Sequence, residues 1–475
     1  MKIKSLLLSS FLATSLFAES YFEYDPTLGN INKVNPDSYG NTVLAISKSG
    51  ALNADNLARF SWADADAMKS LTTDLTNAPT NFAGFDIVGG FNVNLFTATA
   101  GEYKALDLKG NVRFIGYKNG EIDYFRIYNY DGKIHPTNTV ALASVDSLTI
   151  ANAAVLKIET NTRLTGDKVV IDHDKSGIVV SSGTLEYQVK ETNWNRSHTY
   201  LQVDQGATFK MMTPADMKVN AGTIAGNFIN DTTNSLLFEG KYAMVLADTG
   251  LLFSKGRLKI SGKVEVSGDM IYTSNNGSLL MNATGELTLN KRNALQSATL
   301  STKAEYDADV NRDKTFLVLQ ENGSDVYYKL GGTTVVATGG SNVLNINARN
   351  SFALTFSAAE RLTINIASDA TLVLTNITFA GKDTESVVTL NNFENDAIFL
   401  LSNALNGYDK IYDFSVFDAE GNEYSKADMA LVAGNFEGLS GYWLTVPALA
   451  VPEPAEWAMI FGGIALGLAI YRRRK

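Results

Sequence analysis

Two short polar segments contain residue types that could do chemistry. In the first, Asp172, His173, Asp174 and Lys175 follow an apolar run and precede Gly177. Carboxylates on both sides of an imidazole could act as acid and base, or hold a cation. Turns between strands collect the same residue types without any catalytic role. We therefore interpret this cluster as a turn and assign no catalytic residue.

The second segment carries oxygen ligands at alternate positions, as calcium loops do. These ligands are Asp307, Asp309, Asn311 and Asp313. Arg312 stands where an EF-hand requires glycine, and Val318 stands where its closing glutamate belongs. The spacing therefore predicts a looser surface site for Ca2+, and the alternative is an acidic, solvated turn. No other cofactor is expected.

The motifs of several common enzyme classes are absent from the sequence. It contains no Gly-rich phosphate loop, no Gly-x-Ser-x-Gly elbow and no His-Glu-x-x-His pair. The chain also has no cysteine, which excludes thiol catalysis, cysteine-bound metals and disulfides. Its three histidines, His135, His173 and His198, are too few for a histidine-rich metal site. The sequence therefore predicts a protein that is not an enzyme.

Short β-strands must position these segments. From about residue 141 to residue 400, short apolar runs alternate with Gly, Asn, Asp and Ser. Period-two alternation within some of these runs indicates an all-β fold. We assign residues 141–400 to a β-helix-like repeat region. Residues 19–140 form a predicted N-terminal cap region, and residues 401–450 a C-terminal cap and linker.

Two stretches repeat regularly enough to favour a parallel β-helix, or solenoid. Between Gly256 and Gly268, apolar residues alternate in two six-residue units bounded by glycine. Further on, four apolar residues recur every ten positions, namely Leu344, Leu354, Ile364 and Leu374. Stacked coils would join such residues into one apolar column, with Asn345, Asn347 and Asn350 in side-chain ladders along the turns. The alternative is an antiparallel β-sandwich or meander, which also gives ten-residue spacing.

Residues 1–18 predict a secretory signal peptide. Lys2 and Lys4 precede an apolar run from Leu6 to Phe17, and Ala18 supplies a small residue for cleavage. The run is shorter than the ~20 residues that span a bilayer, which disfavours a retained anchor. We expect export by the Sec translocon and cleavage by signal peptidase.

Residues 451–475 predict a sorting signal that ends in a single transmembrane α-helix. The segment begins with Val451, Pro452, Glu453 and Pro454 and ends with Arg472, Arg473, Arg474 and Lys475. Between these ends lies an apolar run of 15 residues from Trp457 to Tyr471, about 22 Å long as a helix. Basic residues beside a span resist translocation, so the basic end is expected to stay in the cytoplasm and stop transfer.

This order of Pro-Glu-Pro, apolar helix and basic end resembles the PEP-CTERM sorting domain of Gram-negative bacteria. The resemblance is confined to residues 451–475 and includes every part of the domain in order. It implies that the membrane enzyme exosortase recognises the tail and processes it near the Pro-Glu-Pro motif. It also implies a precursor that is anchored transiently in the inner membrane. The alternative is a plain tail anchor preceded by a chance Pro-Glu-Pro.

The charge of the chain limits its partners. Removal of residues 1–18 and 451–475 from the 40 basic and 50 acidic residues leaves 34 and 48, a net charge near −14. Phosphate backbones and anionic lipids repel such a surface, so nucleic acid is not an expected partner. A hydrophobic content of 45% over 475 residues is enough to build a core without disulfides.

These features predict an exported, exosortase-processed protein of the cell surface or extracellular matrix. The body is expected to have a structural or adhesive role in a biofilm, with extracellular polysaccharide as its partner. The alternative is a carbohydrate-active β-helix enzyme, either a polysaccharide lyase or a glycosidase. Such enzymes need charged side chains from neighbouring coils that converge on one groove, and a Gly-His-Gly signature typical of them is not found.

Overall fold

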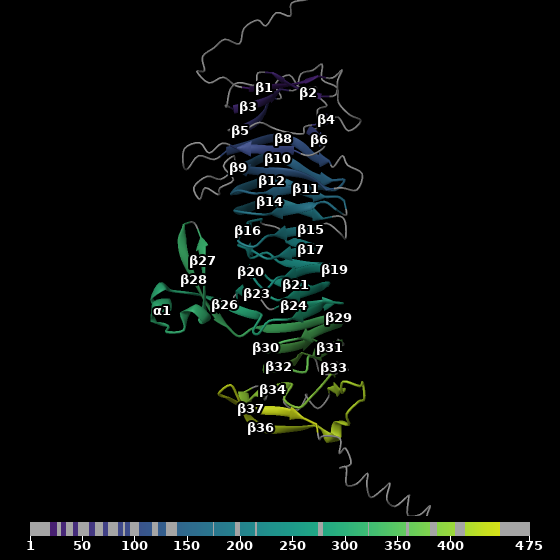
Figure 1. Ribbon diagram of the computed structural model, residues 1–475. Helices are drawn as coiled ribbons and strands as arrows, with labels where there is room; N and C mark the ends of the chain where they lie inside the picture. The colour runs from purple at the N-terminus through teal and green to yellow at the C-terminus, as the bar shows by residue number, and fades with distance from the viewer. Residues whose placement is uncertain are drawn as a thin grey trace, which may run out of the picture.

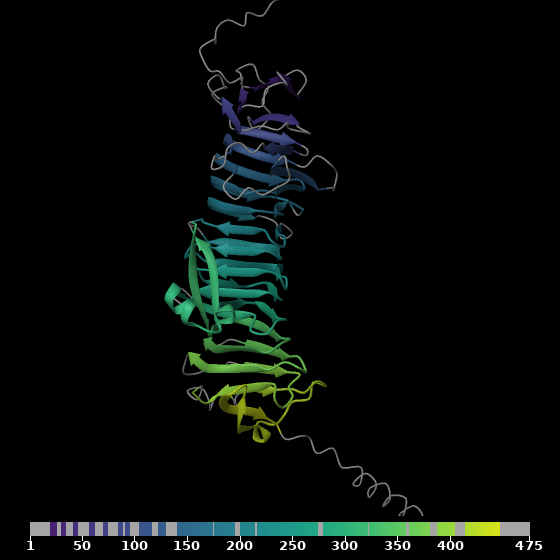
Figure 2. The same cartoon turned by 60° about the vertical axis from the view of Figure 1, so that its left-hand side comes forward.

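The computed structural model describes separate strands between residues 20 and 129 and an almost continuous chain from residue 140 to residue 446. The breaks in the second part are residues 174, 195–199, 214–215, 274–278, 322, 358–360, 381–386 and 404–413. Side chains are described mainly from residue 147 onward. The described strands form a long column, with β1 at one end and β36 and β37 at the other (Figures 1 and 2).

The column is a β-solenoid in which each coil contributes strands to parallel stacks. From β10 onward, paired residues of successive coils are 18 to 26 positions apart, except in one longer coil. The first stack contains β8 (Lys104–Ile115), β10 (Val140–Ala151), β12 (Thr162–Ile171), β14 (Thr184–Trp194), β16 (Thr208–Met211), β18 (Asn227–Asn230), β20 (Leu251–Ser254), β23 (Asp269–Thr273) and β26 (Leu295–Ser301).

Two further stacks share long strands that bend from one stack into the other. The second stack contains β17 (Met217–Ile224), β19 (Leu236–Leu246), β21 (Leu258–Ile260), β24 (Leu279–Ala283), β29 (Thr334–Ile346), β30 (Asn350–Ser357) and β32 (Leu372–Ala380). The third stack contains the second halves of β17, β19 and β29 together with β7 (Phe91–Leu95), β9 (Asp123–Asn129), β11 (Ala154–Ile158), β13 (Gly177–Val180), β15 (Tyr200–Val203), β22 (Lys263–Val266), β25 (Glu286–Leu289), β31 (Arg361–Ile366), β33 (Val387–Asn391) and β35 (Ser415–Val416).

One continuous apolar core runs along the inside of the column. In β16, β18, β22 and β25 every second residue is buried, as expected when successive side chains point to opposite faces of a strand. The buried residues of successive coils belong to a single cluster that extends from Phe114 to Val446. The parallel β-helix predicted from the sequence is therefore confirmed, and the antiparallel sandwich is not.

The ten-residue repeat corresponds to about half a coil. Leu344 lies beside Ile364 in the third stack, whereas Leu354 pairs with Ile377 and Leu374 with Phe352, on either side of a register shift between β30 and β32. All four side chains are fully buried. Leu344 and Ile364 therefore stack directly, whereas Leu354 and Leu374 face the same core from positions that do not pair with each other.

Glycine allows two coils to approach at the bend between β21 and β22. A Cβ atom on Gly262 would lie 2.3 Å from the carbonyl oxygen of Gly240 in the preceding coil, closer than real contacts allow. The apolar residues on either side of Gly262 point inward and are fully buried, as the two six-residue units predicted. Glycine at this bend therefore sets how closely the backbones pack.

Asparagine side chains form a ladder on the outer face of the third stack. The Asn365 amide donates to the side-chain oxygen of Asn345 at 2.6 Å, and the Asn391 amide donates to Asn365 at 2.9 Å. Asn347 donates to Asn290 in the neighbouring turn at 2.8 Å. Asn350 is instead buried, and it accepts from the backbone N–H of Ala294 at 3.0 Å. The predicted ladder along the turns is thus found for Asn347, whereas Asn345 lies within β29 and its ladder follows strands.

An antiparallel hairpin closes the C-terminal end of the column. It consists of β36 (Ala430–Phe436) and β37 (Leu439–Thr445), and β37 pairs with β34 (Ile398–Leu401) of the last coil. The Trp443 ring lies 4.8 Å from Phe399 and 5.2 Å from Phe436. Glu437 in the hairpin turn forms ion pairs with Arg292 and Arg349 at 2.5 and 2.9 Å. This cap covers an edge that would otherwise pair with other chains.

The N-terminal end differs from the predicted organisation. There β1 (Ser20–Asp25) pairs antiparallel with β2 (Asn30–Val34), but it pairs in parallel with β3 (Asn41–Ala45). Parallel pairs then connect β4 (Leu57–Ser61), β5 (Ser70–Asp74) and β6 (Gly84–Val88) to the first stack. Parallel coils therefore begin well before residue 141, because these short strands stack despite longer and less regular spacing.

No helix within the described ranges is both long and apolar enough to cross a bilayer. The signal peptide at 1–18 and the transmembrane helix predicted within 451–475 lie outside the described residues.

Phe209→Ala should strongly reduce the free energy of unfolding. The buried Phe209 ring lies 5.3 Å from Tyr187 and 5.1 Å from Phe228, each in a neighbouring coil. The lost burial and the remaining cavity should cost about 3–5 kcal/mol, measured by urea denaturation followed by far-UV circular dichroism. Thr223→Ala, at an exposed position on β17, should change the value by less than about 0.5 kcal/mol. Equal losses for both variants would contradict the stacked core.

Candidate functional site

One long coil places a hairpin on the outside of the first stack. After β26, the chain forms two short helices, α1 (Lys303–Ala308) and α2 (Arg312–Thr315), before it returns to the column at β29. The antiparallel hairpin of β27 (Phe316–Glu321) and β28 (Ser324–Gly331) follows the helices, and β28 also pairs with the end of β26. Figures 1 and 2 show this hairpin along the side of the column, with its turn toward the N-terminal coils.

A second, smaller apolar core holds the hairpin against the column. Phe253 and Ile271 point outward from β20 and β23, yet both are buried. They pack against Leu319 and Tyr328 of the hairpin and Ala298 of β26. Removal of this apolar surface from water favours the docked position of the hairpin.

Polar contacts at the edge of this core reinforce the docking. The ammonium of Lys255 lies 2.6 Å from Asp231 and 2.9 Å from Glu321, and the Tyr328 hydroxyl donates to Glu321 at 2.8 Å. Burial alone would lower the pKa of Lys255, but its hydrogen bonds to Asp231 and Glu321, together with the charge of Asp231, outweigh burial and raise the pKa. Burial, together with the Glu321 carboxylate, raises the pKa of Tyr328 to about 12.

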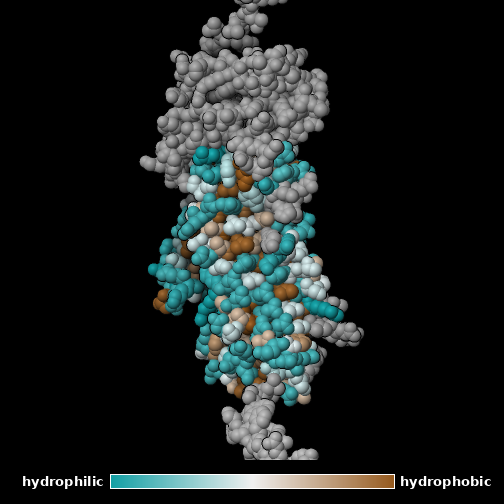
Figure 3. Space-filling view, turned by 45° about the vertical axis from the view of Figure 1, so that its right-hand side comes forward, coloured by the Kyte–Doolittle hydropathy of each residue, from teal (hydrophilic) through white to brown (hydrophobic). Residues whose placement is uncertain are grey.

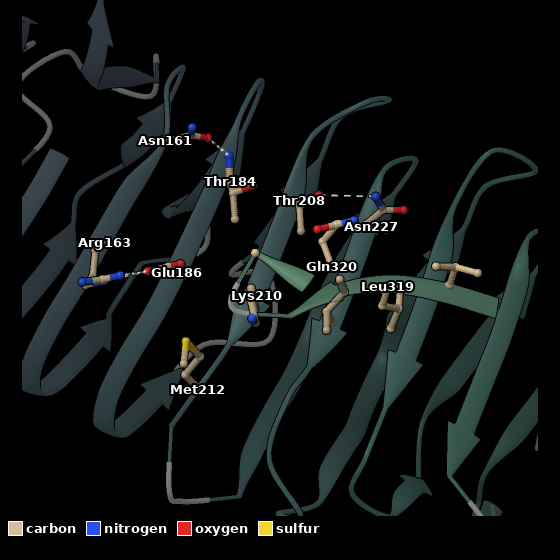
Figure 4. Close-up of a pocket in the computed structure, with 13 residues that line it drawn as sticks. Asn161, Arg163, Thr184, Glu186, Thr208, Lys210, Met212, Asn227, Leu319 and Gln320 are labelled. Carbon is tan, nitrogen blue, oxygen red and sulfur yellow. Dashed lines mark hydrogen bonds and ion pairs between the residues drawn. The ribbon is translucent and has the colours of Figure 1, made fainter. Parts of the chain in front are cut away.

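A groove of about 560 Å³ lies beside the docked hairpin. Its floor is the outer face of the first stack, and its wall is β27 with the hairpin turn. Figure 4 shows Leu319 and Gln320 of the hairpin across from side chains of the first stack. The lining residues are Asn161, Arg163, Thr184, Glu186, Thr208, Lys210, Met212, Asn227, Ile229, Val318, Leu319, Gln320 and Gly323. We call this feature the groove.

Four polar side chains, one from each of four successive coils, form a row along the floor of the groove. The strand register aligns Thr184 with Thr208 and Thr208 with Asn227, and the side-chain oxygen of Asn161 accepts from the backbone N–H of Thr184 at 2.9 Å. The Asn227 amide donates to the Thr208 hydroxyl at 3.3 Å. We call these four residues the polar column; they can both donate and accept hydrogen bonds.

A charged column runs beside the polar one, and its charges are internally balanced. The register aligns Arg163 with Glu186 and Glu186 with Lys210. The Arg163 guanidinium lies 2.6 Å from the Glu186 carboxylate, and the Lys210 ammonium lies 3.3 Å from Asp231. All of these side chains are partly buried. The groove therefore offers hydrogen-bonding groups and apolar surface rather than an uncompensated charge.

The predicted calcium ligands are not gathered into a site. The segment folds into α1 and α2, where Asp307 pairs with Lys303 at 2.6 Å. Asp309 follows the end of α1, and hydrogen bonds from the Asn311 backbone and the Thr315 hydroxyl lower its pKa. Asp313 lies in the first turn of α2. No cluster of three His, Cys, Asp or Glu side chains able to hold a metal occurs among the described residues, so the geometry fits the alternative of an acidic turn.

The Asp172–Lys175 cluster lies on a turn between β12 and β13, as interpreted from the sequence. Nδ1 of His173 accepts from the backbone N–H of Ala153 at 3.1 Å and from that of Lys175 at 3.3 Å. The imidazole thus ties one turn to that of the preceding coil. Asp174 lies outside the described residues, and so do His135, His198 and the whole sorting tail.

The groove was not predicted from the sequence, because its wall belongs to an insertion that is far along the chain from the strands of its floor. A signal for the docked hairpin exists in hindsight: Leu251–Phe253 and Met270–Tyr272 are apolar without alternation. Continuous apolar runs indicate strands that are covered on both faces. The sequence does not reveal which segment provides the outer cover.

No family model and no curated protein matches the chain. The site is therefore interpreted from its own geometry.

The hairpin should undock in alkaline solution between about pH 10 and pH 12. Lys255 and Tyr328 both have pKa values raised above their ordinary values of 10.5 and 10.0, so the docked state holds more protons than the undocked state in this range. Their contribution to docking is complete below pH 10 and falls as the pH rises. Because the chain has no cysteine, an environment-sensitive dye on Gln320→Cys can report the change.

Two variants test the origin of this transition. Tyr328→Phe should make the dye response less steep above pH 10, since one titrating group is gone. Lys255→Met should shift the dye signal toward the undocked value already at pH 7, because Glu321 loses its cationic partner. Far-UV circular dichroism at each pH separates undocking from unfolding of the column. A dye signal that stays constant to pH 12 while the column remains folded would show that these contacts do not hold the hairpin.

Proposed function

We propose that this protein is an exported, exosortase-processed component of the cell surface or extracellular matrix. The observation that carries the proposal is the order of parts in residues 451–475, namely Pro452-Glu453-Pro454, an apolar run and four basic residues. Paired with the predicted signal at 1–18, this order suits a precursor held briefly in the inner membrane. Processing near the motif then leaves the β-solenoid outside the cell.

The shape of the body supports a structural or adhesive role. The coils form a long column whose first and last described strands lie at opposite ends (Figure 1). While the tail still anchors the precursor, the N-terminal coils are the end of the column farther from the membrane. The coloured part of the face in Figure 3 is mostly hydrophilic, with apolar side chains in small separate patches, as suits a body surrounded by hydrated polysaccharide.

The enzyme alternative receives less support from the groove. Hydrolysis of a glycoside commonly uses two carboxyl groups that flank the scissile bond. Among the described residues that line the groove, Glu186 is the only carboxylate, and Arg163 already holds it at 2.6 Å. A scaffold that carries a binding groove is therefore the function that we propose for the body.

Expression of the full chain with and without exosortase tests the sorting proposal. Intact-protein mass spectrometry should show a product without residues 472–475 only in cells that have the enzyme. Pro452→Ala combined with Pro454→Ala should reduce this product at least about tenfold, because these prolines keep the motif extended and non-helical.

Pro447→Ala is the matched control, since this proline precedes the motif by a few residues and is not part of it. It should be processed like the natural sequence. A C-terminus that stays intact in the presence of the enzyme would make a plain tail anchor the better explanation.

A further inference from the structure

We propose that the groove binds one extended strand of an uncharged polysaccharide. The strand would run along the column axis, over the polar column and beside β27. This inference rests on the proposed function, because it needs the body to lie among extracellular polysaccharide. It adds the location of the contact and the chemical class of the ligand.

The repeat of the polar column fits a ligand that is itself repetitive. Asn161, Thr184, Thr208 and Asn227 come from successive coils, so their side chains recur at the spacing of neighbouring strands, about 4.8 Å. This spacing is comparable to the length of one sugar ring in an extended chain. Each ring can therefore meet one hydroxyl or amide group, and every coil adds the same kind of contact.

The charge balance of the groove favours an uncharged strand over an acidic one. Three of the described residues that line the groove are charged, namely Arg163, Glu186 and Lys210, and each has an opposite charge within 3.3 Å. An acidic polysaccharide would have to compete with Glu186 for Arg163 or with Asp231 for Lys210. Loss of a partner leaves a partly buried charge uncompensated, which is costly.

The wall of the groove supplies apolar surface for the C–H faces of sugar rings. Val318 on β27 is 38% exposed and lines the groove with Leu319, Ile229 and Met212. Gln320 adds an amide on the same wall, across from the polar column in Figure 4. A volume of about 560 Å³, apolar surface and a few placed polar groups are typical of ligand sites in proteins.

Calorimetric titration of the full-length protein tests the inference. The probes are linear hexasaccharides of glucose, mannose, galactose and xylose, with hexagalacturonate as the acidic comparison. At least one neutral hexasaccharide should bind, and more tightly than hexagalacturonate. Thr184→Val combined with Thr208→Val removes two hydroxyl groups from the polar column with little change in shape. It should weaken binding about tenfold or more.

Thr223→Val is the matched control, because this threonine is exposed on the outer face of β17, away from the residues that line the groove. It should bind like the natural protein, and all variants should keep its far-UV spectrum and urea midpoint. Absence of binding by every neutral hexasaccharide at millimolar concentration would overturn the inference, as would tighter binding of hexagalacturonate or equal binding by the groove variant.

Failure of the inference can be distinguished from failure of the proposed function. Processing by exosortase depends on residues 451–475, whereas the titration depends on the groove. If the protein is processed but binds no neutral sugar, the sorting proposal stands and the proposed role of the groove is wrong. If the protein binds neutral sugar but keeps its tail, the groove binds as proposed and the sorting proposal is wrong.

Discussion

The structure depends on inward-facing apolar side chains that lie directly above those of the preceding coil. In a strand, a shift of one residue turns every inward side chain outward, so the register of each coil is strictly limited. From β10 onward, coil length nevertheless varies from 18 to 26 residues, apart from the one longer coil, and the variation is taken up in turns between strands. The aromatic stack of Tyr187, Phe209 and Phe228 shows the result, with rings from three coils in contact inside the column.

The same constraint explains the long coil between β26 and β29. An insertion of this size is tolerated only if the chain returns to the column in register. It returns at β29, which pairs in parallel with β24 and β25. Once outside, the inserted hairpin needs an apolar surface of its own, which Phe253 and Ile271 provide. The groove begins where this cover ends and the outward residues change from apolar to polar, from Ile229 to Lys210.

The sequence predicted the repeat well because its signals are local. The alternation between Gly256 and Gly268 and the ten-residue spacing from Leu344 to Leu374 follow directly from inward-facing positions. The irregular N-terminal coils lack such spacing, and their parallel pairing was missed. The acidic segment from Asp307 to Asp313 resembled a cation loop because spacing alone does not show that helices separate its carboxylates. The groove could not be predicted, since it depends on contact between β27 and strands about a hundred residues earlier.

The direction of the backbone hydrogen bonds has a mechanical consequence. Bonds between successive coils point along the axis of the column, so tension applied between its two ends opens them one rung at a time instead of shearing whole strands at once. Each released coil of 18 to 26 residues can extend by about 60 to 90 Å. A column fixed at one end and pulled at the other would therefore lengthen in steps. The ion pairs of Glu437 with Arg292 and Arg349, and the apolar core under the docked hairpin, should make the coils that they join harder to separate.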